Sequence, residues 1–402
     1  MFIIYFLLLL FNNFCYAEEP ISVYLTWQRD PLTTMTIQWI TSLNDARDTL
    51  HYWPEANETD KKTVQMGGHS RMPAFYPYLI HRTELIHLEP GTSYCFRLND
   101  EEKVYKFKTM PALLTKPISF VVGGDMYHDE IEYVATMNKQ AIATNPDFVL
   151  IGGDIAYAED RNKSRQKRWL EWLVVWGNTM VTQDGHLVPM IPTIGNHDVH
   201  KGFNQNPSKA AFFYAIFDLP GYRALDFGNY LSVIALDSGH THPIEGAQTR
   251  WLEQTLGERT QVKHKLAFYH IPAYPSVRDF NYKNSREIRR HWTTLFEKLG
   301  LHFAFEHHDH AYKRTFPLKN REVDASGVVY FGDGAWGVKS PRSPRNPKNT
   351  WYLARTAQKR HFIHVKLFAE KREFKAIDDK GILFDFSTHN MQQVEQLQFV
   401  PT

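Results

Sequence analysis

Residues 118–125 read ISFVVGGD and residues 147–154 read DFVLIGGD, so an apolar run followed by Gly-Gly-Asp occurs twice in close succession. A third apolar run, residues 187–198, reads LVPMIPTIGNHD. Short apolar runs bounded by glycine are typical of strands that are buried on both faces. The helices expected around these strands cover residues 130–144, 169–176 and 248–256. Strands that alternate with helices predict a layered α/β domain.

The first part of the chain has a different pattern. From residue 21 to about residue 110 it runs in short stretches rich in β-branched and aromatic residues, with Pro, Asn, Asp or Gly between most of them. This pattern predicts a small antiparallel β-sandwich. Its expected strands are residues 23–27, 35–40, 78–81, 84–88 and 94–98.

Three aromatic residues in this region have predicted structural roles. Trp27 and Trp39 alternate with polar neighbours, which favours core packing over ligand binding. Tyr94 lies in a segment, LEPGTSY, that resembles the tyrosine corner of fibronectin type III domains, so we expect its hydroxyl to bond to upstream backbone. Residues 110–117 form a proline-flanked connector, which is the predicted domain boundary.

The first 17 residues are predicted to be a signal peptide. They contain an apolar run from Phe2 to Phe11 and end in Ala17, a small residue suited to cleavage. The run is too short to cross a bilayer, which needs about 20 apolar residues. We therefore expect a secreted or extracytoplasmic protein without a transmembrane segment after signal removal. The expected domains are a signal peptide at 1–17, a fibronectin type III-like β-sandwich at 18–112, and a layered α/β/β/α domain at 117–402.

Composition excludes several other classes of protein. Among 402 residues, 43% are hydrophobic and 22% are charged, which is typical of soluble globular chains. The net charge of +2 gives no electrostatic case for nucleic-acid binding. Cys15 would leave with the signal peptide, so Cys95 is expected to be unpaired. Asn57-Glu58-Thr59 and Asn162-Lys163-Ser164 are glycosylation sequons that only a eukaryotic secretory pathway would use.

Polar side chains follow the three predicted strands of the α/β domain. Asp125, Asp154 and the pair Asn196-His197 each come directly after an apolar run. Active groups of α/β folds collect outside the carboxyl ends of the strands. One Asp after Gly-Gly is usually a turn or cap residue. Three such strand ends together favour a functional site.

Imidazoles follow two further apolar runs. His270 ends the run LAFYH, and His308 and His310 follow FAFEH. Two histidines at i and i+2 reach one locus only where the chain turns, which is how loops build metal sites. A donor set of carboxylates, an amide oxygen and imidazoles without thiolates suits zinc, iron or manganese better than copper(I).

In chain order, these residues resemble the five sequence blocks of calcineurin-like metallophosphoesterases. The blocks are GD at 124–125, GDIAY at 153–157, GNHD at 195–198, YH at 269–270 and HDH at 308–310. Tyr157, three residues after Asp154, is typical of the purple acid phosphatase branch of that superfamily. The resemblance covers nearly all of the chain after the predicted signal peptide.

The resemblance implies a pair of metal ions. Metal one, expected to be Fe(3+), would be bound by Asp125, Tyr157 and His310. Metal two, expected to be Zn(2+), Mn(2+) or Fe(2+), would be bound by Asn196, His270 and His308. Asp154 would bridge both ions. Such a pair lowers the pKa of a bound water, so that a metal-bound hydroxide attacks the phosphate.

The resemblance also implies catalytic residues, and the chain departs from the family at some positions. His197 is expected near the phosphate as an orienting or proton-donating group, with Asp198 as its partner. The family usually has glycine where this chain has His307 and Tyr127. We expect Tyr127 to form part of the pocket wall. Arg278 lies near the place where plant members carry substrate-facing histidines, so it is either a phosphate contact or an ordinary solvent-facing charge.

The predicted function is that of an acid phosphatase acting on small phosphate monoesters. A phosphodiesterase or nucleotide phosphohydrolase would use the same metal centre, and stays open as an alternative. A non-catalytic binding protein on this scaffold is a third possibility. The complete set of ligands argues against it, because a decayed site is expected to lose ligands first.

Overall fold

The structure is a computed structural model that describes residues 19–391, except residues 45–48, 66–67, 75, 100, 159–166 and 333. The predicted signal peptide and the sequon at 162–164 lie outside the described residues. Asn57 of the other sequon is exposed, and its side chain accepts a hydrogen bond from the N–H of Thr59. Within the described part of the chain, none of the helices is long and apolar enough to cross a membrane.

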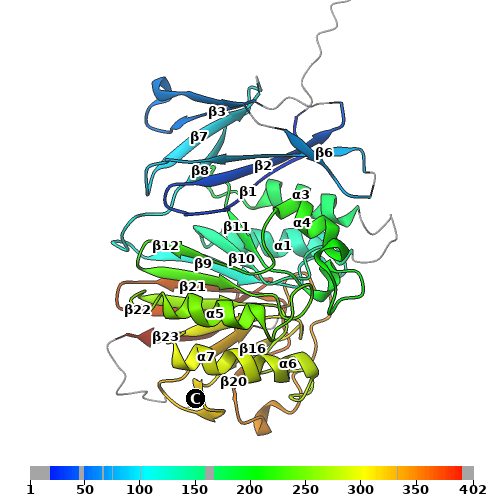
Figure 1. The fold of residues 1–402 in the computed structure, drawn as a ribbon, viewed down its shortest axis with the longest axis vertical. Coiled ribbons are helices and arrows are strands. Elements are labelled where there is room, and N and C mark those ends of the chain that lie inside the picture. The colour runs from blue at the N-terminus through cyan, green and yellow to red at the C-terminus, as the bar shows by residue number, and fades with distance from the viewer. Residues whose placement is uncertain are drawn as a thin grey trace, which may run out of the picture.

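Two four-stranded antiparallel sheets form the amino-terminal β-sandwich, at the top of Figure 1. In spatial order, the strands of the first sheet are β1 (Ser22–Thr26), β2 (Met35–Ser42), β6 (Tyr78–Leu85) and β5 (His69–Arg71). Those of the second are β4 (Lys62–Gln65), β3 (Thr49–Pro54), β7 (Ser93–Leu98) and β8 (Tyr105–Lys108). Trp27 and Trp39 are fully buried, and the hydroxyl of Tyr94 accepts a hydrogen bond from the N–H of Glu89 at 2.9 Å. These predictions are confirmed, and Cys95 is a free buried thiol.

One strand prediction is wrong. Residues 78–81 and 84–88 were expected to be separate strands, but β6 is one continuous strand that pairs with β2 along its whole length. Arg82, between the two predicted strands, uses its long side chain to reach Gln38 and Asp218. The strand ends before His87, whose backbone has a φ of 57°.

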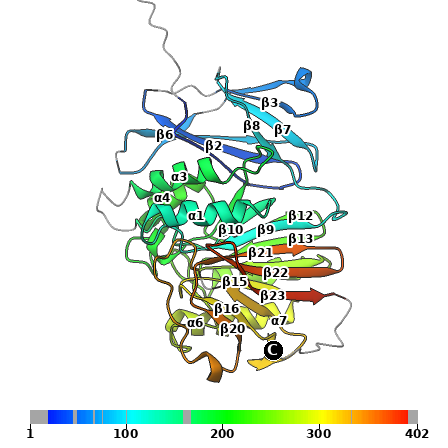
Figure 2. The same ribbon diagram turned by 180° about the vertical axis from the view of Figure 1, so that it is seen from behind.

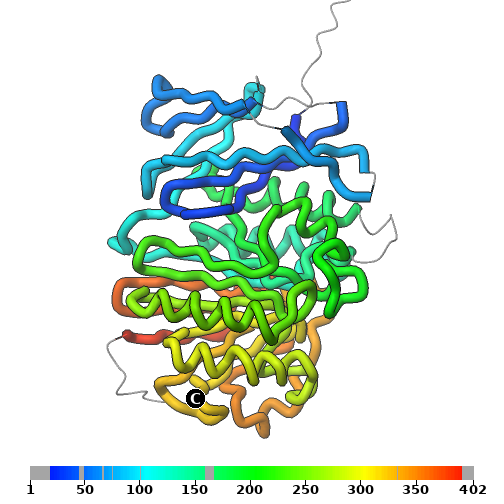
Figure 3. Tube along the Cα trace, in the orientation of Figure 1, coloured from blue at the N-terminus to red at the C-terminus, as the bar shows by residue number. Residues whose placement is uncertain are grey.

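The second part of the chain has the predicted four layers (Figures 1 and 2). One central sheet contains, in spatial order, β11 (Met190–Pro192), β10 (Phe148–Ile151), β9 (Ile118–Gly123), β21 (His361–Leu367), β22 (Lys371–Asp378) and β23 (Leu383–Asn390). The other contains β12 (Arg223–Phe227), β13 (Leu231–Ala235), β14 (His264–Phe268), β15 (Phe303–Glu306), β19 (Val329–Gly332), β16 (Tyr312–Thr315) and β20 (Leu353–Ala357). The tube in Figure 3 shows how the chain returns to lay β21 beside β9.

Helices cover the outer faces of the two sheets. The helices over the first sheet are α1 (Ile131–Ile142), α3 (Arg168–Thr179) and α4 (Ala211–Phe217). Those over the second are α5 (Ala247–Gly257), α6 (Lys283–Ile288) and α7 (Thr294–Lys298). Because side chains alternate along a strand, Phe120 and Val122 of β9 face the second sheet while Val121 faces the helices. Both faces of the central parallel strands, such as β9, β10, β13 and β14, are therefore buried, as the continuous apolar runs predict.

The β-sandwich packs on the helical layer of the α/β part. The hydroxyl of Ser22 in β1 donates to the backbone oxygen of Leu173 in α3 at 2.7 Å. Gly177 permits this approach, because a Cβ at that position would lie 2.9 Å from the backbone oxygen of Val23. The two parts of the chain thus share a tightly packed boundary.

Buried histidines predict a loss of stability in acid. Burial, with Arg372 nearby, lowers the pKa of His264 to about 3 and of His389 to about 4, and burial with Lys366 lowers that of His364 to about 4. In the unfolded chain these groups take up protons near pH 6.5, whereas in the fold they do not. We expect the melting temperature to fall by several degrees between pH 7 and pH 4. A melting temperature that rises over this range would contradict the prediction.

Candidate metal centre

The predicted ligands gather at one edge of the two central sheets. Strands β9, β10 and β11 are parallel neighbours, as are β13, β14, β15 and β19. Asp125, Asp154 and Asn196 follow the first group of strands, and His270 and His308 follow the second. Parallel strands deliver their carboxyl ends to the same edge, which explains why residues distant in sequence meet here.

Many of these residues have a backbone conformation that non-glycine residues rarely adopt. Positive φ angles occur at Asp125 (54°), Asp154 (52°), Tyr157 (51°), His308 (75°) and His310 (59°). Left-handed backbone at a side-chain-bearing residue costs free energy and persists where the surroundings hold it in place. Such strain is concentrated at functional sites. Here it occurs at residues that follow the strand ends and carry the predicted metal ligands.

Three donor atoms of the metal-one set lie within hydrogen-bonding distance of one another. The hydroxyl of Tyr157 is 2.8 Å from Oδ1 of Asp125 and 3.1 Å from Nε2 of His310. That Nε2 is in turn 2.7 Å from Oδ1 of Asp125. All three side chains are buried. A carboxylate, a phenol and an imidazole therefore point at one locus.

The metal-two set makes a second group of the same kind. Nε2 of His270 lies 3.1 Å from Oδ1 of Asn196 and 3.1 Å from Nδ1 of His308. The other nitrogen of His270, Nδ1, lies 2.9 Å from the backbone oxygen of Gly152, to which it must donate. In the neutral ring, Nε2 therefore has a lone pair that faces other acceptor atoms without a hydrogen between them. A cation bound at this position would be coordinated by these acceptor atoms.

The carboxylate of Asp154 lies beside the metal-two group. Its Oδ1 accepts the backbone N–H of His197 at 2.7 Å, and its Oδ2 lies 3.2 Å from Nε2 of His270. Oδ2 is buried and has no hydrogen bond of its own to the described residues. Oxygen and nitrogen atoms of Asp154, His270 and His308 lie within 4.8 Å of one another. An unsatisfied carboxylate oxygen in this place fits a bridging metal ligand.

The electrostatics of the site favour positive charge. Burial alone would lower the pKa of His270, but the charge of Asp154 outweighs it and raises the pKa to about 9. Burial, followed by the carboxylates of Asp125 and Asp154, raises the pKa of Tyr157 well above its ordinary value of about 10. The phenol would ionise only beside a strong cation. The residues present thus fit a metal pair held by oxygen and nitrogen donors.

Asp198 holds two loops of the site together through backbone hydrogen bonds. Its buried carboxylate accepts the backbone N–H groups of Asp154, Ile155 and Gly195, each at 2.9 Å. Burial and the charge of Asp154 raise its pKa. Asp198 therefore joins the loop after β10 to the loop after β11, and its catalytic role stays a prediction.

Tyr127 and Arg278 are held by contacts within the protein. The hydroxyl of Tyr127 donates to Glu171 of α3 at 3.0 Å, and the guanidinium of Arg168 lies 3.8 Å from its ring centre. Arg278 donates to the backbone oxygen of His308 at 2.6 Å and to Oδ1 of Asp309 at 2.8 Å. Because these contacts hold its guanidinium, Arg278 is not an ordinary solvent-facing charge. Roles of both residues toward substrate remain predictions.

A buried ion pair beside the histidine loops was not predicted from the sequence. Glu306 and Lys313 are fully buried and bonded to each other. Glu306 also accepts the hydroxyl of Tyr269 at 2.7 Å and the N–H of Ala273 at 2.6 Å, on either side of His270. A charged residue at the end of the apolar run FAFE was the available signal, because buried charges require partners.

His128 is a second residue that the sequence did not single out. Its ring packs edge-on against Tyr157 and His310, with ring centres 4.9 and 4.8 Å apart. Nδ1 of His128 lies 2.6 Å from Oδ2 of Asp129. No pattern in the sequence distinguishes this histidine from a surface residue.

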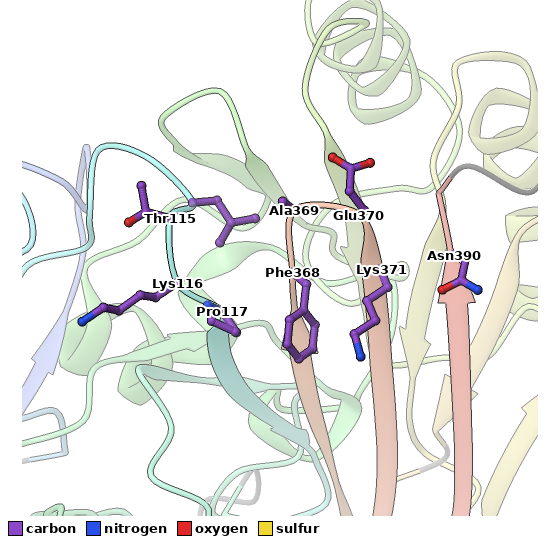
Figure 4. Close-up of a pocket in the computed structure, with 9 residues that line it drawn as sticks. Thr115, Lys116, Pro117, Phe368, Ala369, Glu370, Lys371 and Asn390 are labelled. Atoms are coloured by element: carbon purple, nitrogen blue, oxygen red, sulfur yellow. The ribbon is translucent and has the colours of Figure 1, made fainter.

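A hollow of about 540 Å³ lies at the opposite end of β9 from the candidate metal centre. Figure 4 shows it between Lys116 and Pro117 of the connector and Phe368 and Lys371 of the β21–β22 hairpin. Pro117 directly precedes β9, whereas Asp125 follows it. This hollow has no part in the metal site.

Fold and site together define a metallophosphoesterase. The sequence profile of calcineurin-like phosphoesterases matches residues 118–312, and that of the purple acid phosphatase amino-terminal domain matches residues 20–109. The chain therefore belongs to the purple acid phosphatase family. It is a metal-dependent acid phosphatase, and its family implies a dinuclear metal centre.

Relatives in plants and animals agree with this assignment. Purple acid phosphatase 22 of Arabidopsis thaliana is 24% identical over 316 residues, which are 75% of this chain and 69% of the relative. Acid phosphatase type 7 of Mus musculus is 22% identical over 421 residues, covering 90% of this chain and 91% of the relative. A purple acid phosphatase from yellow lupin (Lupinus luteus) seeds has the same fold, with a TM-score of 0.73 at 17% identity over 92% of this chain and 74% of the lupin chain.

Proposed function

We propose that this chain is a secreted enzyme that hydrolyses small phosphate monoesters at a dinuclear metal centre. The ligands of metal one would be Asp125, Tyr157 and His310, those of metal two Asn196, His270 and His308, with Asp154 shared. Fe(3+) is expected as metal one and Zn(2+), Mn(2+) or Fe(2+) as metal two. The observation that carries the proposal is that two groups of oxygen and nitrogen donors lie at one edge of the sheets, with Oδ2 of Asp154 3.2 Å from Nε2 of His270. When bound, the two ions activate a water molecule and bind phosphate oxygens.

His197 is the residue proposed to act on the substrate. Its ring stacks on that of Tyr157, with the centres 4.6 Å apart and the planes at 25°, and it is only half-buried. The backbone bond to Asp154 fixes the position of the residue beside the donor atoms. An imidazole held in this way would orient the phosphate and donate a proton to the leaving oxygen.

Replacing His197 with alanine is therefore expected to lower kcat by about a hundredfold, because one proton-transfer group is typically worth 10² or more. The metal content, measured by atomic emission on the purified variant, is expected to stay at the wild-type ratio. His186→Ala is the matched control, since His186 is a half-buried histidine that bonds to Ser93 of the sandwich. Loss of both metals in His197→Ala would instead make His197 a metal ligand.

Substrate class is tested by comparing kcat/KM for a phosphate monoester, a phosphodiester and a nucleotide on the same metal-loaded preparation. The proposal expects the monoester to be preferred. A higher kcat/KM for the diester or the nucleotide would move the assignment to one of those classes. Secretion is tested by expressing the full chain in a eukaryotic host, where the exported protein is expected to begin at Glu18.

A further inference from the structure

His307 occupies the space between the two strand ends that carry the aspartates. A Cβ added to Gly152 would lie 1.8 Å from Cδ2 and 1.9 Å from Nε2 of His307, and one added to Gly124 would lie 2.8 Å from its Nδ1. Real Cβ atoms do not approach other atoms this closely. The imidazole therefore lies directly against the backbone of both glycines, with one ring nitrogen beside each.

These two glycines stand at the roots of the metal-binding loops. Gly124 directly precedes Asp125, and Gly152 is two residues before Asp154. The strands are already joined here, because the N–H of Gly152 donates to the oxygen of Gly123 at 2.7 Å and that of Asp125 to the oxygen of Gly153 at 3.0 Å. A rigid ring against this pair of strand ends limits how far the two loops can move relative to each other.

The ring of His307 contacts its surroundings through van der Waals packing and makes no hydrogen bond to the described residues. His307 is 1% exposed, and neither of its ring nitrogens has a hydrogen-bond partner among the described residues. Its backbone N–H donates to the oxygen of His270 at 2.9 Å, which joins the same residue to the metal-two histidine loop. Gly334 packs closely against Asp125 and His307, because a Cβ at Gly334 would lie 1.8 Å from Oδ2 of Asp125 and 3.0 Å from Cβ of His307. His307 is thus packed among the strand ends at Gly124 and Gly152, the loop of His270, and the segment of Gly334.

We propose that His307 is a positioning residue that sets the spacing between Asp125 and Asp154, and hence between the two metal ions. The imidazole of His307 fills the space that Gly152 leaves free because it has no side chain. We therefore expect that a change at either residue alone weakens metal binding. This inference rests on the proposed metal centre. It assigns a role to a position at which the family usually has glycine.

The first experiment compares metal binding by wild type and His307→Ala, measured by competition with a chelator for each of the two metal equivalents. The expected result is at least a tenfold loss of affinity for one equivalent and a shifted visible band in the iron-loaded protein. His364→Ala is the matched control. It removes a buried histidine that bonds to Ser119 at the opposite end of β9, and should lower the melting temperature with unchanged metal affinity.

The second experiment is a double-mutant cycle with Gly152→Ala. Alone, Gly152→Ala is expected to weaken metal binding because its methyl group collides with the ring. In Gly152→Ala/His307→Ala the space is available again, so metal affinity should recover above that of Gly152→Ala. Unchanged affinity in His307→Ala, or purely additive losses in the double variant, would overturn the inference. Failure of wild type to bind two metal ions would instead overturn the proposed metal centre itself.

Discussion

Replacing Asp154 with alanine is expected to remove activity and metal binding together. Asp154 is fully buried, and its Oδ2 lies beside the metal-two histidine while its Oδ1 holds the loop of His197. Without this carboxylate, two cations would face each other with less negative charge between them. Turnover should fall to background, and atomic emission should find less than about one metal ion per chain after loading.

Asp237→Ala is the matched control for that experiment. Asp237 also follows a buried strand, β13, but its carboxylate accepts the N–H groups of His240, Thr241 and His242 within its own loop. Its loss is expected to lower stability while the metal-to-protein ratio of the folded fraction stays at the wild-type value. Near-normal turnover in metal-loaded Asp154→Ala would contradict the bridging role.

Among the substitutions considered, Lys313→Met is expected to cause the largest loss in the free energy of unfolding. The substitution keeps most of the side-chain volume but leaves the carboxylate of Glu306 buried without its cation. Removing one partner of a buried pair typically costs about 3–5 kcal/mol. The free energy of unfolding, measured by denaturant titration, should fall by that amount. Because Glu306 bonds to Tyr269 and Ala273, the loop of His270 should loosen as well.

An exposed ion pair provides the comparison. Arg29 binds Glu84 at 2.6 Å, but 65% of the Arg29 side chain is exposed. Arg29→Ala is expected to change the free energy of unfolding far less than Lys313→Met does, because solvent screens such pairs. Equal losses in Lys313→Met and Arg29→Ala would show that the buried pair has no special importance.

The parts of the site that local sequence encodes were predictable. Asp125, Asp154 and His270 each follow an apolar strand directly, so the pattern places them at the carboxyl edge of a sheet. Tyr157 was assigned through the resemblance to purple acid phosphatases. In the structure its hydroxyl lies beside Asp125 and His310, whereas the hydroxyl of Tyr127 bonds to Glu171.

Features that depend on packing between distant segments were not predictable. The contact of His307 with Gly152 joins two strands of different sheets, and no periodicity records it. The partner of Glu306 could not be named either, since Lys313 reads as an ordinary residue of a half-polar strand. The continuity of β6 was not predicted either, since the residues that Arg82 contacts, on β2 and after α4, are distant in sequence.

The visible spectrum of the iron-loaded protein tests the metal centre most directly. A phenol with an ordinary pKa of about 10 becomes a phenolate at neutral pH only when a strong cation holds it. Wild type should bind about two metal ions per chain and show a phenolate-to-iron band that gives a purple to pink colour. The band should disappear in Tyr157→Phe, which keeps the ring, and persist in Tyr127→Phe. An iron-loaded wild type without the band, or a band that survives in Tyr157→Phe and disappears in Tyr127→Phe, would contradict the assignment of Tyr157 as a metal ligand.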